Sequence, residues 1–175
     1  AIAAASVTTD FTYTILNGTY CQVTGYTGTD TEISIPSEID GYIVQSIAGN
    51  AFYGNTTLTT VVLPETVETI GSYVFYECTA LTDVRLNNGL RNLGAYTFSG
   101  CTGLTQIDLP STLTTIEERA FQGCTALESI VLPDSVKTIG ESAFAECDSL
   151  KSVTISDNVT TIGDHAFDGC DFLAD

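Results

Sequence analysis

An internal repeat with a period of 23 residues constrains this chain more than any other feature. Several kinds of position recur at this interval, and each keeps one chemical type of side chain. The recurring leucines are Leu58, Leu81, Leu104, Leu127, Leu150 and Leu173, and the recurring phenylalanines are Phe52, Phe75, Phe98, Phe121, Phe144 and Phe167. An aliphatic position recurs at Ile47, Ile70, Leu93, Ile116, Ile139 and Ile162, and a thiol at Cys78, Cys101, Cys124, Cys147 and Cys170. One such unit cannot bury its own apolar side chains, so we expect successive coils to stack into a solenoid with like residues in contact.

Within one unit the pattern predicts short elements. Ile130 and Leu132 alternate around Val131, which is typical of a strand that ends at Pro133. The segment 134–140 carries a second inward pair and ends at a glycine, so we expect a short extended or turn segment there. In 141–147, apolar residues could share one face of a single helical turn, and we predict a short helix or 3₁₀ turn.

The N-terminal part departs from the repeat. Residues 11–35 predict a capping β-hairpin followed by the first strand, with Asn17-Gly18 as a two-residue turn. A cap would shield the apolar side chains and strand edges of the end coil from water. Residues 1–10 form a leader that could be disordered. The repeats occupy 36–175 as a single solenoid domain, and the first unit is enlarged around residues 40–42, which we expect to bulge out.

The run Leu-x-x-Ile-x-Leu-Pro-x-x-Val-x-x-Ile-Gly-x-x-Ala-Phe-x-x-Cys, seen most fully at 127–147, resembles the BspA-like (Treponema-type) leucine-rich repeats. The resemblance covers about residues 11–173, with departures that include Glu117 in place of the glycine. It implies a right-handed leucine-rich repeat solenoid with parallel short strands on one face and short helical turns on the other. It also implies a secreted or cell-surface protein that binds host matrix proteins or other cells, and it supplies no catalytic or ligand-binding motif to transfer.

The net charge of the chain limits the classes of partner that it can bind. The formal net charge is −17, from 22 acidic residues against five basic ones. Such a surface repels phosphate backbones, which excludes nucleic acid as a partner. We interpret the acids, including those of the last 20 residues, as a solvated surface, with weak cation binding as a lesser alternative. No stretch reaches the roughly 20 apolar residues that a transmembrane helix needs.

The pattern of the cysteines and the single histidine predicts neither a metal site nor a catalytic site. Five thiols in one column have parallel Cβ directions, which suit neither a disulfide nor the tetrahedral geometry of zinc, so we expect buried free thiols and no metal or cofactor. His165 belongs to a column that accepts any polar or aromatic residue, and it lacks a partner nucleophile motif. We therefore expect that the chain is not an enzyme.

Tyrosine provides the first candidate binding patch. All eight tyrosines lie at or before Tyr96, and four of them pair across one repeat, namely Tyr53 with Tyr76 and Tyr73 with Tyr96. Partly exposed tyrosine is typical of protein interfaces, so these four form a candidate patch. The alternative is that the rings merely pack on one another.

The rival patch is the outward column of the strands. Its members in the repeats are Val62, Arg85, Asp108, Val131 and Thr154. Repeat proteins commonly bind through such a face. The sequence therefore predicts a non-catalytic module that binds or adheres to another protein. The alternative is a structural spacer or scaffold repeat segment of a larger surface protein, with no ligand of its own. Among partners, the sequence also allows a second copy of the chain, through an uncapped C-terminal end.

Overall fold

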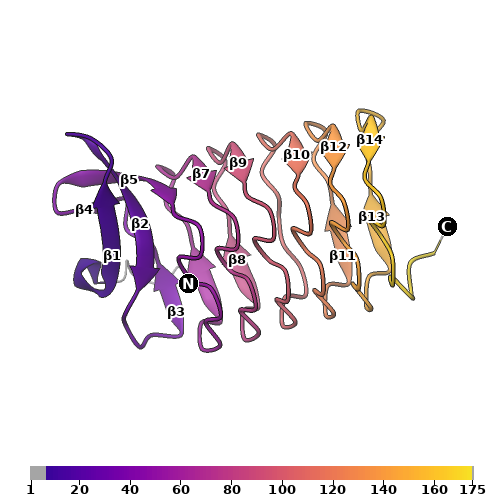
Figure 1. Cartoon of the computed structure of the whole chain (residues 1–175), viewed down its shortest axis with the longest axis horizontal. Coiled ribbons are helices and arrows are strands. Elements are labelled where there is room, and N and C mark those ends of the chain that lie inside the picture. Colours follow the sequence, from indigo (N-terminus) through magenta and orange to yellow (C-terminus); the bar gives the residue numbers. More distant parts are fainter. Residues whose placement is uncertain (1–6, 175) are drawn as a thin grey trace.

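The computed structural model describes residues 7–174. Short strands are stacked in two rows along the length of the molecule, with a hairpin at one end and the last coil at the other (Figure 1). The fold is a leucine-rich repeat solenoid in which each coil contributes one turn of the chain. The leader predicted for residues 1–10 lies partly outside the described residues, and Thr8–Asp10 form a single 3₁₀ turn, η1.

The hairpin consists of β1 (Phe11–Ile15) and β2 (Tyr20–Tyr26), which pair antiparallel. Its loop is longer than the predicted two-residue turn, because the Leu16 amide donates to the Tyr20 carbonyl. The Asn17 side-chain oxygen accepts the Thr19 amide at 2.9 Å and stabilises this wider loop. β2 also pairs in parallel with β5 (Tyr42–Ile47) and thereby joins the hairpin to the solenoid.

The extra residues of the first unit form a second, smaller hairpin rather than an irregular bulge. β4 (Glu38–Ile39) pairs antiparallel with β5. Asp40 and Gly41 join the two strands with φ values of 50° and 86°. Two successive residues with positive φ match the twist of a tight hairpin, which explains the Asp-Gly pair.

Two rows of parallel strands run through the coils. The first row contains β3 (Glu32–Ser34), β6 (Thr60–Val62), β8 (Asp83–Arg85), β11 (Ser129–Val131) and β13 (Ser152–Thr154). The second row contains β5 followed by β7 (Thr69–Ile70), β9 (Asn92–Leu93), β10 (Thr115–Ile116), β12 (Thr138–Ile139) and β14 (Thr161–Ile162). We call the outward side of the first row the strand face.

Identical side chains lie over one another in the core. Successive rings of the phenylalanine column are stacked with centroids 5.3 to 5.5 Å apart. Each thiol of the cysteine column donates to a phenylalanine carbonyl of the preceding coil, as Cys101 does to Phe75 at 3.1 Å. These contacts bind neighbouring coils together, so the apolar burial of one coil depends on the next.

The helical turns predicted for the segments that carry these phenylalanines are wrong. Each segment is a series of turns. Along the segment, one amide donates to a carbonyl of its own coil and the next amide donates to a carbonyl of the following coil, in alternation. The Phe75 amide, for example, donates to the Thr97 carbonyl at 2.9 Å, and the Cys78 amide donates to the Phe75 carbonyl. Two residues in each segment have a positive φ, which no α-helix accommodates. The first of each pair is Asn50, Tyr73, Tyr96, Arg119, Ser142 or His165, and the second, four residues later, is Gly54, Glu77, Gly100, Gly123, Glu146 or Gly169. We call the outward side of these segments the turn face.

The second strand row is interrupted where glutamate replaces glycine. At Gly71, Gly94, Gly140 and Gly163 an added Cβ would lie 2.4 to 2.6 Å from backbone atoms of the preceding coil. Glu117 occupies the equivalent position and does carry a Cβ, so its coil cannot approach as closely. Accordingly β9 and β10 are not paired, whereas β7 pairs with β9 and β10 with β12.

Candidate functional site

The four tyrosines of the predicted patch form one cluster on the turn face. The Tyr53 and Tyr76 rings stack at 4.9 Å, and the Tyr73 and Tyr96 rings stack at 4.5 Å. The two stacks also meet, because the Tyr73 and Tyr76 rings lie 5.6 Å apart at an interplanar angle of 58°. The rings are therefore in mutual contact and still partly exposed, with Tyr53 at 52%.

The backbone fixes where these rings project. Tyr73 and Tyr96 are held at φ values of 61° and 59°, and their amides donate to carbonyls of the next coil. A positive φ costs a bulky residue on the order of 1 kcal/mol or more, so it persists only where surrounding bonds determine it. The tyrosine cluster is thus preorganised by the same inter-coil hydrogen bonds that stack the phenylalanines.

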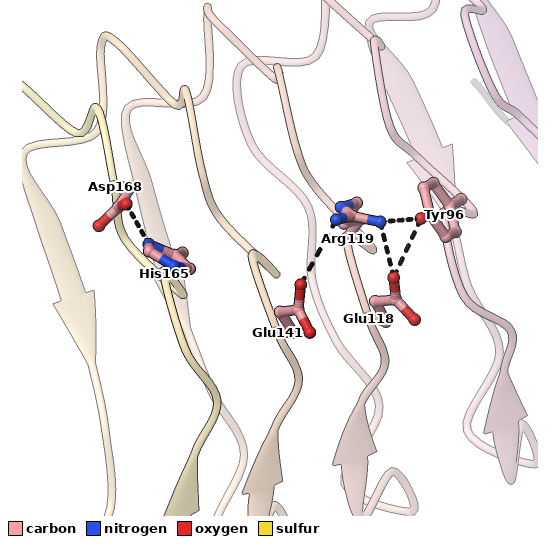
Figure 2. A network of polar contacts seen from close by, with 6 residues as sticks. All are labelled: Tyr96, Glu118, Arg119, Glu141, His165 and Asp168. Carbon is pink, nitrogen blue, oxygen red and sulfur yellow. Dashed lines mark hydrogen bonds and ion pairs between the residues drawn. The ribbon is translucent and has the colours of Figure 1, made fainter.

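The Tyr73–Tyr96 stack ends on a charged network that Figure 2 shows. The Arg119 guanidinium carbon lies 5.4 Å from the centre of the Tyr96 ring, and an Arg119 nitrogen donates to the tyrosine hydroxyl. Arg119 also pairs with Glu118 at 2.7 Å and with Glu141 at 3.4 Å. These two contacts place the guanidinium beyond the hydroxyl edge of Tyr96 and not over its ring face, so Arg119 links the stack to the next coil through a hydrogen bond and ion pairs.

Nearby carboxylates affect the hydroxyls of the cluster. The Arg119 hydrogen bond lowers the pKa of Tyr96, but burial and Glu118 outweigh it and hold that pKa above its ordinary value. Burial and the Glu77 carboxylate raise the pKa of Tyr76. Both hydroxyls therefore remain protonated at neutral pH and can donate or accept hydrogen bonds.

The strand-face column is more dispersed. Val62 is half-buried and in register with the exposed Arg85, whose guanidinium pairs with Asp83 at 3.0 Å. Val131 is 63% exposed and in register with Thr154. Asp108 belongs to no strand, because the pairing of the first row stops at β8 and resumes only at β11.

Two shallow grooves flank this interruption. One of about 460 Å³ lies between β8 and residues 106–108, and one of about 270 Å³ lies between residues 106–109 and the β11 coil. The Cβ of Glu117 accounts for the missing β9–β10 pairing of the second row. Nothing in the sequence explains why residues 106–108 of the first row pair with neither β8 nor β11. The strand face thus offers hollows, but its column does not form a continuous surface.

The structure places the predicted thiols in or against the core and the histidine on the turn face. All six cysteines are free, and burial raises the pKa of Cys78 and Cys147 to about 12. His165 lies on the turn face, where its Nδ1 is 2.5 Å from an Asp168 carboxylate oxygen, and this contact raises its pKa (Figure 2). Within residues 7–174, no group of three or more His, Cys, Asp or Glu side chains could hold a metal ion.

The last coil is the least covered by neighbours. Ile162 is 53% exposed and Phe172 is 68% exposed, whereas Ile139 one coil earlier is fully buried. A hollow of about 540 Å³ lies against Phe167 and Leu173. Self-association through this end remains a prediction.

Reasoning from the sequence missed the contribution of Arg119. Its 23-residue spacing from Tyr96 was the available signal, because residues at this spacing lie side by side in successive coils. The roles of Glu118 and Glu141 required the directions of their side chains.

The coil geometry defines a repeat solenoid without helical layers, and comparison with known proteins identifies its family. Residues 45–174 match the BspA type Leucine rich repeat region in six copies, so the chain belongs to this family. No curated sequence is significantly similar to the chain.

Solved structures of similar proteins have the same fold. A leucine-rich repeat protein of T. pallidum, TpLRR, is 30% identical over 98% of this chain and 92% of that one, with a TM-score of 0.84. A leucine-rich repeat protein of Bacteroides ovatus is 33% identical over 94% of this chain, with a TM-score of 0.87. A leucine rich cell surface protein of Faecalibacterium prausnitzii is 29% identical over 98% of this chain, with a TM-score of 0.83. The chain spans 44% and 54% of the length of the last two.

Among residues 7–174, no helix is long and apolar enough to span a membrane.

Proposed function

We propose that this chain is a non-catalytic protein-binding and adhesion module of a secreted or cell-surface protein, and that it recognises its partner through the tyrosine cluster of the turn face. The observation that carries the proposal is the mutual contact of four partly exposed tyrosine rings. Tyrosine supplies a large contact area and a polar hydroxyl, and it is enriched where interfaces derive most of their binding energy.

Preorganisation supports the choice of this face. The rings are held by stacking and by a backbone that is hydrogen-bonded to the next coil, so binding would order few side chains. Ordering a flexible side chain on binding costs on the order of 1 kcal/mol, which a preformed surface avoids. The strand face lacks this advantage between β8 and β11, where its coils are not paired.

Surface display is supported by the similar cell surface protein of Faecalibacterium prausnitzii. The hairpin β1–β2 would serve as the N-terminal cap, since β2 pairs with β5 and fully buries Cys21 and Val23. Because two of the similar proteins are about twice as long as this chain, a spacer without a ligand of its own is the alternative.

The test is surface plasmon resonance of the immobilised full chain against a panel of purified extracellular matrix proteins. Replacing Tyr53, Tyr73, Tyr76 and Tyr96 with serine should weaken binding at least tenfold, as the loss of interface hot spots does. A matched strand-face variant, Arg85→Ser with Asp108→Ser and Val131→Ser, should bind like the wild type. The reverse ranking would contradict the choice of face, and absence of binding to every panel member would favour the spacer.

A further inference from the structure

The exposed side chains of this protein offer a one-electron oxidant few targets besides tyrosine. The sequence contains no methionine and no tryptophan. Five of the six cysteines are buried and Cys170 is half-buried, and burial raises the pKa of all six thiols. Protonated, buried thiols react slowly with oxidants, because the thiolate is the reactive form. Oxidising equivalents that reach the surface are therefore directed to the partly exposed tyrosines.

Tyr73 and Tyr96 are the closest pair of the tyrosine cluster, with ring centroids 4.5 Å apart and an interplanar angle of 14°. Both are partly exposed, and they share one column and nearly the same φ, 61° and 59°, so their rings project in the same direction. Rotation of each ring about its Cβ–Cγ bond turns the two ortho carbons toward each other without moving the backbone. The centroid spacing is also close to that of a biaryl, in which two rings are joined by one C–C bond. The pair is therefore positioned for covalent coupling.

The Tyr96 hydroxyl is already bonded to a proton acceptor. It donates to a Glu118 carboxylate oxygen at 3.0 Å and accepts a hydrogen bond from Arg119 (Figure 2). When the ring loses an electron, its hydroxyl becomes a strong acid, so the phenolic proton passes to Glu118. Loss of an electron from Tyr96 is thus coupled to loss of its proton, which lowers the barrier to the neutral phenoxyl radical.

We propose that Tyr73 and Tyr96 are the site of an oxidative cross-link that joins two successive coils. The oxidant is hydrogen peroxide acting through a haem peroxidase, which removes one electron from each ring. The phenolic proton of Tyr96 goes to Glu118 and that of Tyr73 goes to water. The two phenoxyl radicals form one C–C bond between their ortho carbons, each of which then loses its proton while each oxygen takes one up. In all, two electrons and two protons reduce one hydrogen peroxide to two water molecules.

This modification goes beyond the proposed function and needs no binding partner. A covalent bond between coils restricts the unfolded chain, as a disulfide does, and so stabilises the turn face against unfolding. It also fixes two rings of the tyrosine cluster in place. The sequence positions of the basic residues make the cross-link easy to assign. Because the chain has no lysine or arginine before Arg85, Tyr73 lies in tryptic peptide 1–85, whereas Tyr96 is the only tyrosine of peptide 92–119.

The test treats the dilute full chain with a haem peroxidase and hydrogen peroxide, isolates the monomer by size exclusion and identifies its tryptic peptides by mass spectrometry. We expect peptides 1–85 and 92–119 to be joined with the loss of two hydrogens, together with the fluorescence of dityrosine. Coupling among the other tyrosines of the cluster would leave peptide 92–119 free. The joined peptides therefore report the proposed bond and no link within the first peptide.

The deciding variant is Tyr73→Phe, which keeps the ring but removes the hydroxyl and should abolish the joined peptides. The matched control is Tyr76→Phe, which alters the neighbouring ring of the same coil and should retain them. Glu118→Gln should slow their formation at least about tenfold, because the proton acceptor is lost. Links confined to peptide 1–85, links found only between copies of the chain, or joined peptides that persist in Tyr73→Phe would overturn the inference. An unchanged rate in Glu118→Gln would overturn the role of that carboxylate.

Discussion

The turn face and the strand face of this solenoid differ in the continuity of their backbone pairing. Along the turn face, five successive phenylalanine amides, from Phe52 to Phe144, donate to the next coil at 2.8 to 3.0 Å. Along the strand face, pairing stops at β8 and resumes at β11. The coil of residues 104–126 is thus joined to both neighbours on the turn face, whereas on the strand face it pairs as a strand with neither, although the Thr105 carbonyl still accepts the Glu128 amide.

The difference shows which repeated positions hold the coils together. Both strand rows are interrupted beside the coil of residues 104–126, yet the Phe98 and Phe121 rings remain stacked at 5.4 Å. The turn face is held by three kinds of contact between coils, namely stacked aromatic rings, thiol hydrogen bonds and amides that donate to the next coil. Because all three lie on this side, they persist when strand pairing is lost on the opposite side. The turn face can therefore present side chains in fixed positions, which recognition requires.

The largest expected effect concerns the phenylalanine column. Phe121→Ala should lower the free energy of unfolding by about 3–5 kcal/mol, because the fully buried ring has a stacked neighbour on each side. Phe167→Ala should cost about half as much, since that half-buried ring stacks only on Phe144 among the described aromatic rings of residues 7–174. Urea denaturation of both variants measures the difference, and equal losses would refute the dependence on neighbouring coils.

A smaller effect is expected where coils approach closely. Gly94→Ala should destabilise the fold by about 1–3 kcal/mol, because the new Cβ would lie 2.4 Å from the Gly71 carbonyl carbon. Glu117→Ala in the same column adds no Cβ and should change stability by less than about 0.5 kcal/mol. Thermal unfolding of the pair checks this, and a neutral Gly94→Ala would mean that close packing does not explain the interruption at Glu117.

The smallest effect concerns the exposed end of the turn face. The hydrogen bond to Asp168 raises the pKa of His165, so an NMR titration should give a value above about 6.5. Protonated His165 then stabilises the fold at pH below its unfolded pKa, and this contribution is lost as pH rises through the folded pKa. Asp168→Asn should return the pKa toward its ordinary value, and no change would mean that the contact does not persist in solution.

The sequence was sufficient for the repeat solenoid but not for its local structure. Side chains such as Phe98 and Cys101 recur at the coil period, and any stacking of coils places like residues together. The predicted helices were wrong because positive φ occurs twice in each segment. The first position falls on residues such as Tyr73 and Arg119, which carry no glycine-like signal, whereas the second is glycine in four of the six units and was a signal that the prediction overlooked. Helix formation also competes with inter-coil hydrogen bonds that a sequence pattern does not reveal.

The candidate patch was predictable only in part. The 23-residue spacing was enough to pair Tyr53 with Tyr76 and Tyr73 with Tyr96. Contact between the two stacks depends on side-chain directions across neighbouring columns. The departure at Glu117 was visible in the sequence, but its consequence followed only from the backbone distances at the equivalent glycines.

Native-state hydrogen exchange tests most directly whether the turn face is the continuous element of the solenoid. The amides of Phe98 and Phe121 donate to the next coil, so they should exchange only as fast as global unfolding allows. The amides of Gln106 and Asp108 lie in the unpaired segment and should exchange at least about a hundredfold faster. Equal protection of the two sets, or faster exchange at the phenylalanines, would contradict the account.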